Sequence, residues 1–248
     1  MRKNSSSFRQ SSFAIEALEN RQFLSASATA ARITSDTTVA TTTALDITGR
    51  STTLGQTISI KAVVTSGDGI PKGGTVELLD QNKDTGLVGT LNHLGYFVFT
   101  LDASQAAYIG SHEYRIRFLT DGEFYGSISR DLSAKVATPA YTTESNGLEL
   151  ATVVAGSGTA ATSGETVTVQ YTGYDAATGA VFDDSADHSP GTFNFVLDDS
   201  PEQVISGFDQ EVTGMKVGET RVAVIPSALG YNDGETRIFV VHLVSISA

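Results

Sequence analysis

The sequence predicts a mainly β protein of two domains, a β-sandwich followed by an α+β domain in which a twisted antiparallel sheet wraps one short helix. Short stretches of alternating apolar and polar residues recur along residues 37–248, with the period of half-buried strands. Clusters of Gly, Asp, Asn and Ser separate these stretches, as turns do. One stretch, residues 200–218, has the spacing of a helix instead.

Length and composition limit the classes of protein to which the chain can belong. A length of 248 residues suits two domains, and an apolar share of 40% is enough for hydrophobic cores. The sequence has no run of 18 uncharged apolar residues, so we expect no membrane-spanning helix. Cys is absent and the four His residues are scattered, so we expect no disulfide, no metal site and no cofactor.

The net charge of −12 is concentrated in the last part of the chain. Residues 139–248 contain fifteen Asp and Glu residues but only three basic residues, Lys216, Arg221 and Arg237. An acidic domain repels nucleic acid and anionic membrane surfaces alike. We therefore expect no nucleic acid as a partner, in addition to the expected absence of a membrane span.

Residues 1–36 differ from the rest of the chain. Their start is basic and rich in Ser, and they lack the apolar run of 7–15 residues that a secretory signal needs. This composition predicts a disordered leader. The stretch EALENRQFLSA (16–26) nevertheless resembles the LEPRxLLSA-type motif of planctomycete surface and extracellular proteins, with Asn20 where that motif has Pro. The resemblance implies export to the cell surface or to the extracellular space. Chance similarity in a disordered terminus is the alternative.

Residues 37–138 are expected to form the β-sandwich. Alternating apolar residues predict four strands, at 58–64, 75–80, 95–102 and 113–119. Turn-rich stretches separate them, at 66–74, 81–86 and 120–126. Short strands at this spacing are typical of a sandwich or barrel. No set of acids, bases or nucleophiles converges within this segment.

The same segment resembles the bacterial Ig-like repeat of surface and adhesin proteins. The stretches that carry the resemblance are TTTAL (41–45), LGQTISIKAVVTS (54–66), PKGGTVELLD (71–80) and GEFYGSIS (122–129). It implies an Ig-like β-sandwich. We expect this sandwich to act as a spacer, and adhesion or ligand binding is the alternative.

Residues 148–248 carry the strands and the helix of the α+β domain. Strand patterns lie at 148–154, 166–172, 180–184, 192–198, 221–226 and 237–246. Four apolar residues between them form one stripe of one short helix: Ile205, Phe208, Val212 and Met215. A sheet that buries its apolar face against this helix is the natural arrangement. The preceding residues 139–147 are expected to be a linker or the lead-in to this sheet.

The motifs of residues 148–248 resemble those of FKBP-type peptidyl-prolyl cis–trans isomerases. They are YTG (171–173), VFDDS (181–185), FNFVL (193–197), QVISGFDQEVTGMKVGETRVAVIP (203–226) and RIFVVHLVSI (237–246), in the order of the family. The resemblance implies an FKBP-like fold and isomerase activity on proline-containing polypeptides. It also implies macrolide FKBP ligands as a second class of binding partner.

The resemblance further implies which residues form the site. Catalytic roles fall on Tyr171, Phe182, Asp183, Ile205, Tyr231 and Phe239. Substrate binding falls on Phe193, Val204 and Phe208, the last at a position where many members have Trp. Plain core packing is the alternative for each aromatic residue, and a turn position is the alternative for Asp183.

The implied chemistry needs neither a nucleophile nor a metal. Rotation about an X-Pro amide is slow because of its partial double bond, which sets a barrier of about 20 kcal/mol. A dry aromatic pocket favours the less polar twisted amide. Donors such as the Ile205 N–H and the Tyr231 hydroxyl would hold the substrate carbonyls. Asp183 would orient a tyrosine or interact with the rotating carbonyl.

Two loops depart from the pattern of the family. Only residues 232–238 join Tyr231 to Phe239, where other members have a longer apolar loop that roofs the site. The 186–192 loop is also polar. Both features predict an open pocket that stabilises the twisted amide less well. Two functions therefore stay open: an isomerase that assists the folding of exported proteins, and a non-catalytic FKBP-fold module for binding or adhesion at the cell surface.

Overall fold

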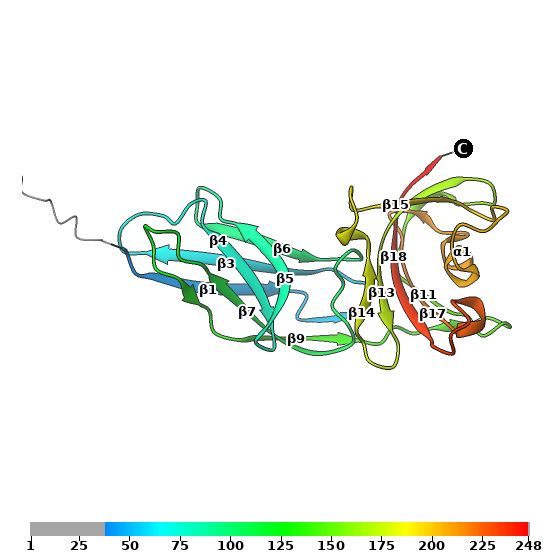
Figure 1. Ribbon diagram of the computed structural model, residues 1–248, viewed down its shortest axis with the longest axis horizontal. Coiled ribbons are helices and arrows are strands. Elements are labelled where there is room, and N and C mark those ends of the chain that lie inside the picture. Colours follow the sequence, from blue (N-terminus) through cyan, green and yellow to red (C-terminus); the bar gives the residue numbers. More distant parts are fainter. Residues whose placement is uncertain (1–37, 248) are drawn as a thin grey trace, which may run out of the picture. The chain divides into compact units, whose positions relative to one another are not determined.

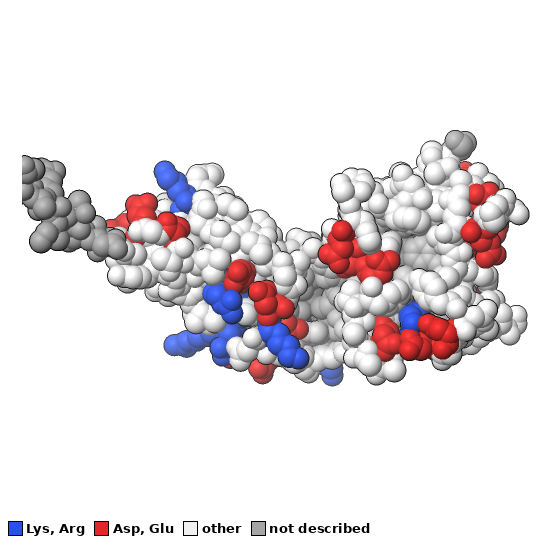
Figure 2. Space-filling model, in the orientation of Figure 1, with Lys and Arg blue, Asp and Glu red and all other residues white. Residues whose placement is uncertain are grey.

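The computed structural model describes residues 38–247, and the expected export leader at 1–36 lies outside them. The described chain is mainly β, as predicted, with strands β1 to β18 and one α-helix, α1 (Figure 1). On the face drawn in Figure 2, acidic side chains predominate over the strands that follow residue 138. Within residues 38–247, no helix is both long and apolar enough to cross a membrane.

The strands before residue 138 form two sheets, which together we call the sandwich. The smaller sheet has the order β1 (Thr41–Thr48), β3 (Ile58–Ser66), β6 (Tyr96–Leu101). The larger has the order β2 (Ser51–Thr53), β9 (Leu132–Ala137), β7 (Gly110–Phe118), β4 (Thr75–Asp80), β5 (Lys83–Thr90), with β8 (Ser127–Ile128) beside β7. All these neighbours run antiparallel except β2 and β9.

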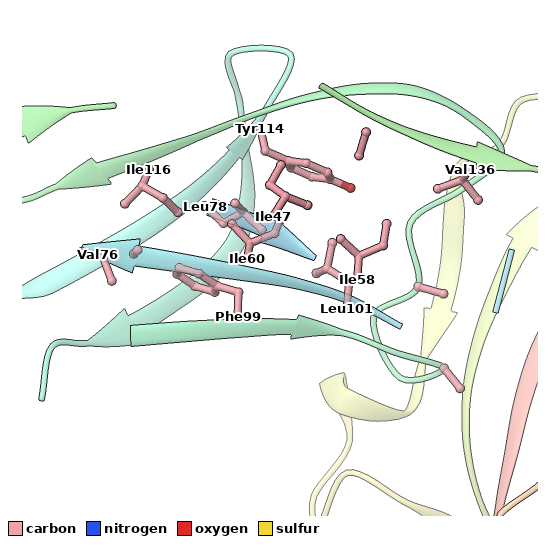
Figure 3. Close-up of a cluster of buried hydrophobic side chains, with 14 of the residues drawn as sticks. Ile47, Ile58, Ile60, Val76, Leu78, Phe99, Leu101, Tyr114, Ile116 and Val136 are labelled. Atoms are coloured by element: carbon pink, nitrogen blue, oxygen red, sulfur yellow. The ribbon is translucent and has the colours of Figure 1, made fainter. Parts of the chain in front are cut away.

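Apolar side chains from both sheets meet in one core (Figure 3). Ile58 and Ile60 point into it from β3, and Leu78 and Ile116 point into it from β4 and β7. All four are completely or almost completely buried. Burying one such side chain contributes about 1.5–3 kcal/mol. The two sheets therefore pack face to face, while the Ig-like assignment stays a prediction.

The prediction of a turn over residues 81–86 is wrong, because the observed turn is shorter. The chain reverses at Gln81 and Asn82 alone, which have φ values of 49° and 64°, and β5 already begins at Lys83. A two-residue turn with positive φ at both positions matches the twist of a hairpin. The polar residues Lys83 and Asp84 therefore pair with Asp80 and Leu79 of β4 instead of forming a loop.

The strands after residue 138 form one further sheet and a separate ribbon. The sheet has the order β10 (Thr142–Thr143), β11 (Glu149–Val154), β17 (Thr220–Ile225), β18 (Arg237–Ser247), β13 (Thr166–Asp175), β14 (Val181–Asp184), with β15 (Phe193–Val196) also paired to β13. The ribbon consists of β12 (Ser157–Ala160) and β16 (Lys216–Val217). Strand β10 lies inside the segment 139–147. The domain boundaries at 37–138, 139–147 and 148–248 stay predictions.

The single predicted helix is confirmed, although it is shorter than the apolar stripe. Helix α1 spans Ser206–Val212, with Ile205 as its N-cap and Met215 beyond its end. The helix packs against β17 and β18. Gly207 permits this close packing, because a Cβ at that position would lie 2.4 Å from Ile225 Cγ2 on β17.

Strand β18 is buried on both of its faces. Phe239 and Val241 belong to the core beneath α1, together with Phe208. Val240, which lies between them, belongs instead to the core that contains Leu54 of the sandwich. Successive side chains of a strand point to opposite faces, so an unbroken apolar run is what a doubly covered strand requires.

The sandwich side of this sheet is held by polar contacts as well. Tyr174 on β13 is almost fully buried, and its hydroxyl donates to the backbone carbonyl of Ala106. The hydroxyl of Thr172 donates to the carbonyl of Ala103 at 2.9 Å. Residues 38–247 accordingly fall within one compact unit.

Helix α1 also carries a buried carboxyl group. Glu211 is completely buried, and neither of its carboxyl oxygens has a hydrogen-bond partner in the described part of the chain. Burial raises the pKa of this carboxyl well above its usual value, more than the nearby Arg221 lowers it. Arg221 Nη1 donates instead to the backbone carbonyl of Glu211, at 2.7 Å.

We predict that Glu211→Gln raises the melting temperature, and that its advantage over the native chain grows as the pH rises. An unfolded Glu ionises at about pH 4.3, whereas burial raises the pKa of Glu211 in the folded chain, so native stability falls as the pH rises above about 4.3. Thermal unfolding at pH 4 and pH 8 measures the effect, at about 2–4 °C per kcal/mol. The exposed Glu144→Gln is the control. An advantage that is the same at both pH values would contradict this account of Glu211.

Candidate active site

A cavity of about 620 Å³ opens between the sheet and the N-terminal end of α1. Eight of the nine predicted site residues line it: Tyr171, Asp183, Phe193, Val204, Ile205, Phe208, Tyr231 and Phe239. The ninth, Phe182, lies outside the lining but packs edge-on against Phe239, with 5.5 Å between ring centroids. The structure thus brings together residues that span almost 70 positions of sequence, and their catalytic roles stay predictions.

Three aromatic rings form the floor of the cavity. Phe208 lies 5.1 Å from Phe239 and 5.7 Å from Tyr171, measured between ring centroids, and both contacts are edge-to-face. Phe208 and Phe239 are only 4% and 3% exposed. Edge-to-face packing is a favoured geometry for aromatic pairs, so the floor is rigid as well as apolar. Phe195, on the same strand as Phe193, is buried behind this floor instead of lining it.

The strand register explains how the rings come so close. Gly173 on β13 is the register partner of Phe239 on β18 and of Asp183 on β14. A Cβ at Gly173 would lie 2.8 Å from the Phe182 ring and 3.0 Å from the Phe239 ring. The absence of a side chain at this position lets the two rings meet above the sheet.

A chain of hydrogen bonds borders the floor. The Tyr171 hydroxyl donates to Asp183 Oδ2 at 2.7 Å, and His188 Nε2 lies 2.8 Å from Asp183 Oδ1. Burial raises the pKa of the Asp183 carboxyl, but the bonds from His188 and Tyr171 outweigh it and hold that pKa below its usual value. Burial, followed by the bond to Asp183, raises the pKa of Tyr171. Asp183 is therefore an anion and Tyr171 a neutral donor at neutral pH.

Two outer rings extend the floor towards solvent. Phe182 and Tyr231 are 41% and 53% exposed, and their ring centroids lie 6.3 Å apart at right angles. The Arg237 guanidinium lies 5.2 Å from the Phe182 ring and 5.9 Å from the Tyr231 ring, within the range of a cation–π contact. Arg237 is itself paired with Asp175, Asp233 and Glu235. The short segment 232–238 thus braces the outer rings, although it does not roof the cavity.

The backbone at the start of α1 supplies a donor. Ile205 lines the cavity, and its N–H has no hydrogen-bond acceptor within residues 38–247. The short 3₁₀ helix η2 (Ser227–Leu229) contributes Ala228 and Leu229 to the opposite wall. The aromatic floor and the free N–H donor together suit a ligand with a small apolar ring flanked by carbonyl groups. The ring would pack on the floor and a carbonyl would accept from the N–H.

Two residues that shape the site, His188 and Arg237, were not predicted from the sequence. His188 lies in the polar 186–192 loop and Arg237 at the start of the 237–246 motif, and their partners become apparent only in three dimensions. An Asp and a His that lie five residues apart form no distinctive motif, so the sequence alone does not identify the pair of Asp183 and His188. No group of three His, Asp or Glu side chains in the described chain could hold a metal ion.

Comparison with known proteins identifies the segment that carries this cavity. The model of the family described as FKBP-type peptidyl-prolyl cis-trans isomerase matches residues 157–241. An FK506-binding protein of Streptomyces anulatus is 44% identical over 102 residues, which cover 37% of this chain and 79% of that protein. The outer membrane protein MIP of Legionella longbeachae is 32% identical over 125 residues, which cover 46% of this chain and 51% of that protein.

Among solved structures, FkpA from Escherichia coli is 31% identical, with a TM-score of 0.39. The similarity covers 43% of this chain and 51% of FkpA. The chain therefore spans about half the length of FkpA and of the Legionella protein, and most of the length of the Streptomyces protein.

We predict that His188 titrates above the usual imidazole range and that Asp183→Asn lowers its pKa. The Asp183 carboxylate accepts a hydrogen bond from the charged imidazolium and so favours it. This pair supports the native fold fully below about pH 6.5, and its contribution is lost as the pH rises through the folded pKa. An NMR titration of the His188 Cε1–H resonance measures the shift, with His93 as the internal control. Identical titrations in both chains would rule out the pair.

Proposed function

The chain belongs to the FKBP-type peptidyl-prolyl cis–trans isomerases, and from that premise we propose that the cavity binds the proline ring of a polypeptide and catalyses rotation about the preceding amide. The observation that carries the proposal is the closed triangle of rings formed by Tyr171, Phe208 and Phe239. These rings leave an apolar concavity of the right chemistry for a pyrrolidine ring, beside polar groups that suit its flanking carbonyls.

Rotation needs the amide to lose its planarity. The planar amide is stabilised by a charge-separated resonance form, which creates a barrier of about 20 kcal/mol. Aromatic walls solvate that polar form poorly. The twisted and less polar amide is therefore stabilised relative to the planar one. This is stabilisation of the transition state over the ground state, which is the requirement for catalysis. No bond to the protein forms or breaks in this step.

Polar groups at the edge of the cavity position the substrate. We assign the free N–H of Ile205 and the hydroxyl of Tyr231 as donors to the substrate carbonyls. Asp183 acts through its bond to Tyr171, which fixes the floor ring, and its carboxylate faces the amide that rotates. Val204 and Phe193 complete the walls against which the residues beside the proline pack.

The second candidate function is a binding module without catalysis. The observation in its favour is the exposure of the outer rings, since Phe182 and Tyr231 face solvent where a longer loop would cover them. Binding requires only the aromatic floor of the cavity, whereas catalysis also requires that water be excluded from the amide. The brace from Arg237 favours catalysis, because it fixes both outer rings without a roof.

We assign the activity to the folding of exported proteins, outside the cell or at its surface. One similar protein supports this assignment, because it is named as an outer membrane protein. The LEPRxLLSA-like stretch at residues 16–26 supports it from the sequence. The sandwich then serves as an Ig-like spacer that carries the isomerase, and macrolides of the kind that FK506-binding proteins are named for are a second class of ligand.

We predict that the full chain accelerates the exchange of an X-Pro peptide, and that Tyr171→Phe, Asp183→Asn and Tyr231→Phe each lower kcat/KM about tenfold. Tyr171→Phe and Tyr231→Phe each remove one hydroxyl donor, whereas Asp183→Asn neutralises the acceptor that holds Tyr171 and His188. A tenfold loss corresponds to about 1.4 kcal/mol. NMR exchange spectroscopy of the peptide measures the rate. Tyr125→Phe, an exposed tyrosine of the sandwich, is the matched control. A folded chain that leaves the exchange at its uncatalysed rate would support the binding module instead.

A further inference from the structure

The rim of the cavity is strongly acidic. Figure 2 shows acidic side chains gathered in three groups around a hollow on the C-terminal part of the molecule. Three acidic segments adjoin the lining in the sequence: residues 183–187, which include η1 (Ser185–Asp187), residues 198–202 and residues 233–235. Glu202 and Asp183 line the cavity themselves.

Basic groups do not balance these carboxylates. Arg237 is the cation nearest to the outer rings, and three carboxylates already pair with it. Arg221 is paired with Glu219 and is mostly buried. Lys216, the remaining cation after residue 138, lies on the ribbon and is not part of the cavity lining. His188 pairs with Asp183 when it is charged.

Glu202 is the rim carboxylate within residues 38–247 that both lines the cavity and has no ion pair or hydrogen bond. Its side chain is exposed. Asp199, by contrast, accepts a bond from Gln203, and Asp233 and Glu235 hold Arg237. An unpaired carboxylate beside a bound peptide is free to pair with a cation of that peptide. Its contribution grows where the substrate excludes water.

The binding site is the aromatic cavity, and the carboxylates surround it. The proline ring occupies the cavity, so the residues on either side of it must cross the acidic rim. A Lys or Arg at those positions meets a negative potential, whereas an Asp or Glu is repelled. Surface charges at this range act within a Debye length of about 8–10 Å, which spans about two or three residues of an extended peptide.

On the basis of the function proposed above, we propose that this isomerase selects cationic substrates, namely polypeptide segments in which Lys or Arg flanks the proline. Glu202 is the specificity-determining residue, and the remaining rim carboxylates provide the surrounding field. The clients of this chain are accordingly basic segments of unfolded proteins. Acidic segments bind less well, whatever their proline content.

The test compares three peptides that differ only in the residue before proline, which is Lys, Ala or Glu. We expect kcat/KM of the full chain to fall in that order at 20 mM salt, by about tenfold from Lys to Glu. At 500 mM salt, screening should reduce this ratio to less than about threefold. Glu202→Gln should lower the Lys-to-Glu ratio at low salt, and Glu202→Lys should reverse it. Glu123→Gln on the sandwich is the matched control and should leave the ratio as it is in the native chain.

The outcomes separate the two proposals. Equal acceleration of all three peptides would overturn the cationic preference and leave the isomerase intact. A ratio that persists in Glu202→Lys would overturn the role of Glu202. If no peptide is accelerated, the proposed catalysis fails. The dissociation constants from NMR titration of the same peptides then decide the preference: Lys tighter than Glu upholds it, and equal affinities overturn it.

Discussion

Strand β18 has to bury apolar side chains on both faces, and the positions of the surrounding elements follow from this constraint. Its odd-numbered residues Phe239 and Val241 need a cover on one side, which α1 supplies, and Val240 needs a cover on the other, which the sandwich supplies. The flanking strands β13 and β17 pair with it along most of its length. Because a slip of one residue would exchange the two faces, the hydrophobic pattern fixes the register of the whole sheet.

The cavity is a consequence of that register. Phe239 projects from β18 beneath the start of α1, and Gly173 beside it leaves room for the neighbouring rings. Helix α1 then delivers Phe208 to the floor and the Ile205 N–H to the edge. The polar groups lie at the border of an apolar surface that is already rigid, so a substrate has little to reorganise. Catalysis by shape and polarity depends on such preorganisation more than on any one reactive group.

Much of this could be predicted from the sequence. Strand patterns located six of the nine described strands after residue 138 but not the short strands β10, β12 and β16. The FKBP-like motifs pointed to eight residues that line one cavity. The alternating pattern was weaker where polar residues pair in a hairpin, as Lys83 and Asp84 do. Contacts between distant residues were not predictable: His188 on Asp183 and Arg237 over Phe182 depend on loop paths that alternation does not specify.

The most direct test of the account is to locate a bound proline. A short peptide with one labelled proline is titrated into the full chain, and intermolecular nuclear Overhauser effects are recorded to labelled Phe and Tyr rings. The account predicts contacts from the proline ring to Phe208, Phe239 and Tyr171, with upfield shifts of the proline protons over the aromatic floor. Contacts confined to rings of the sandwich such as Tyr125, or a folded chain that gives no contacts at saturation, would contradict it.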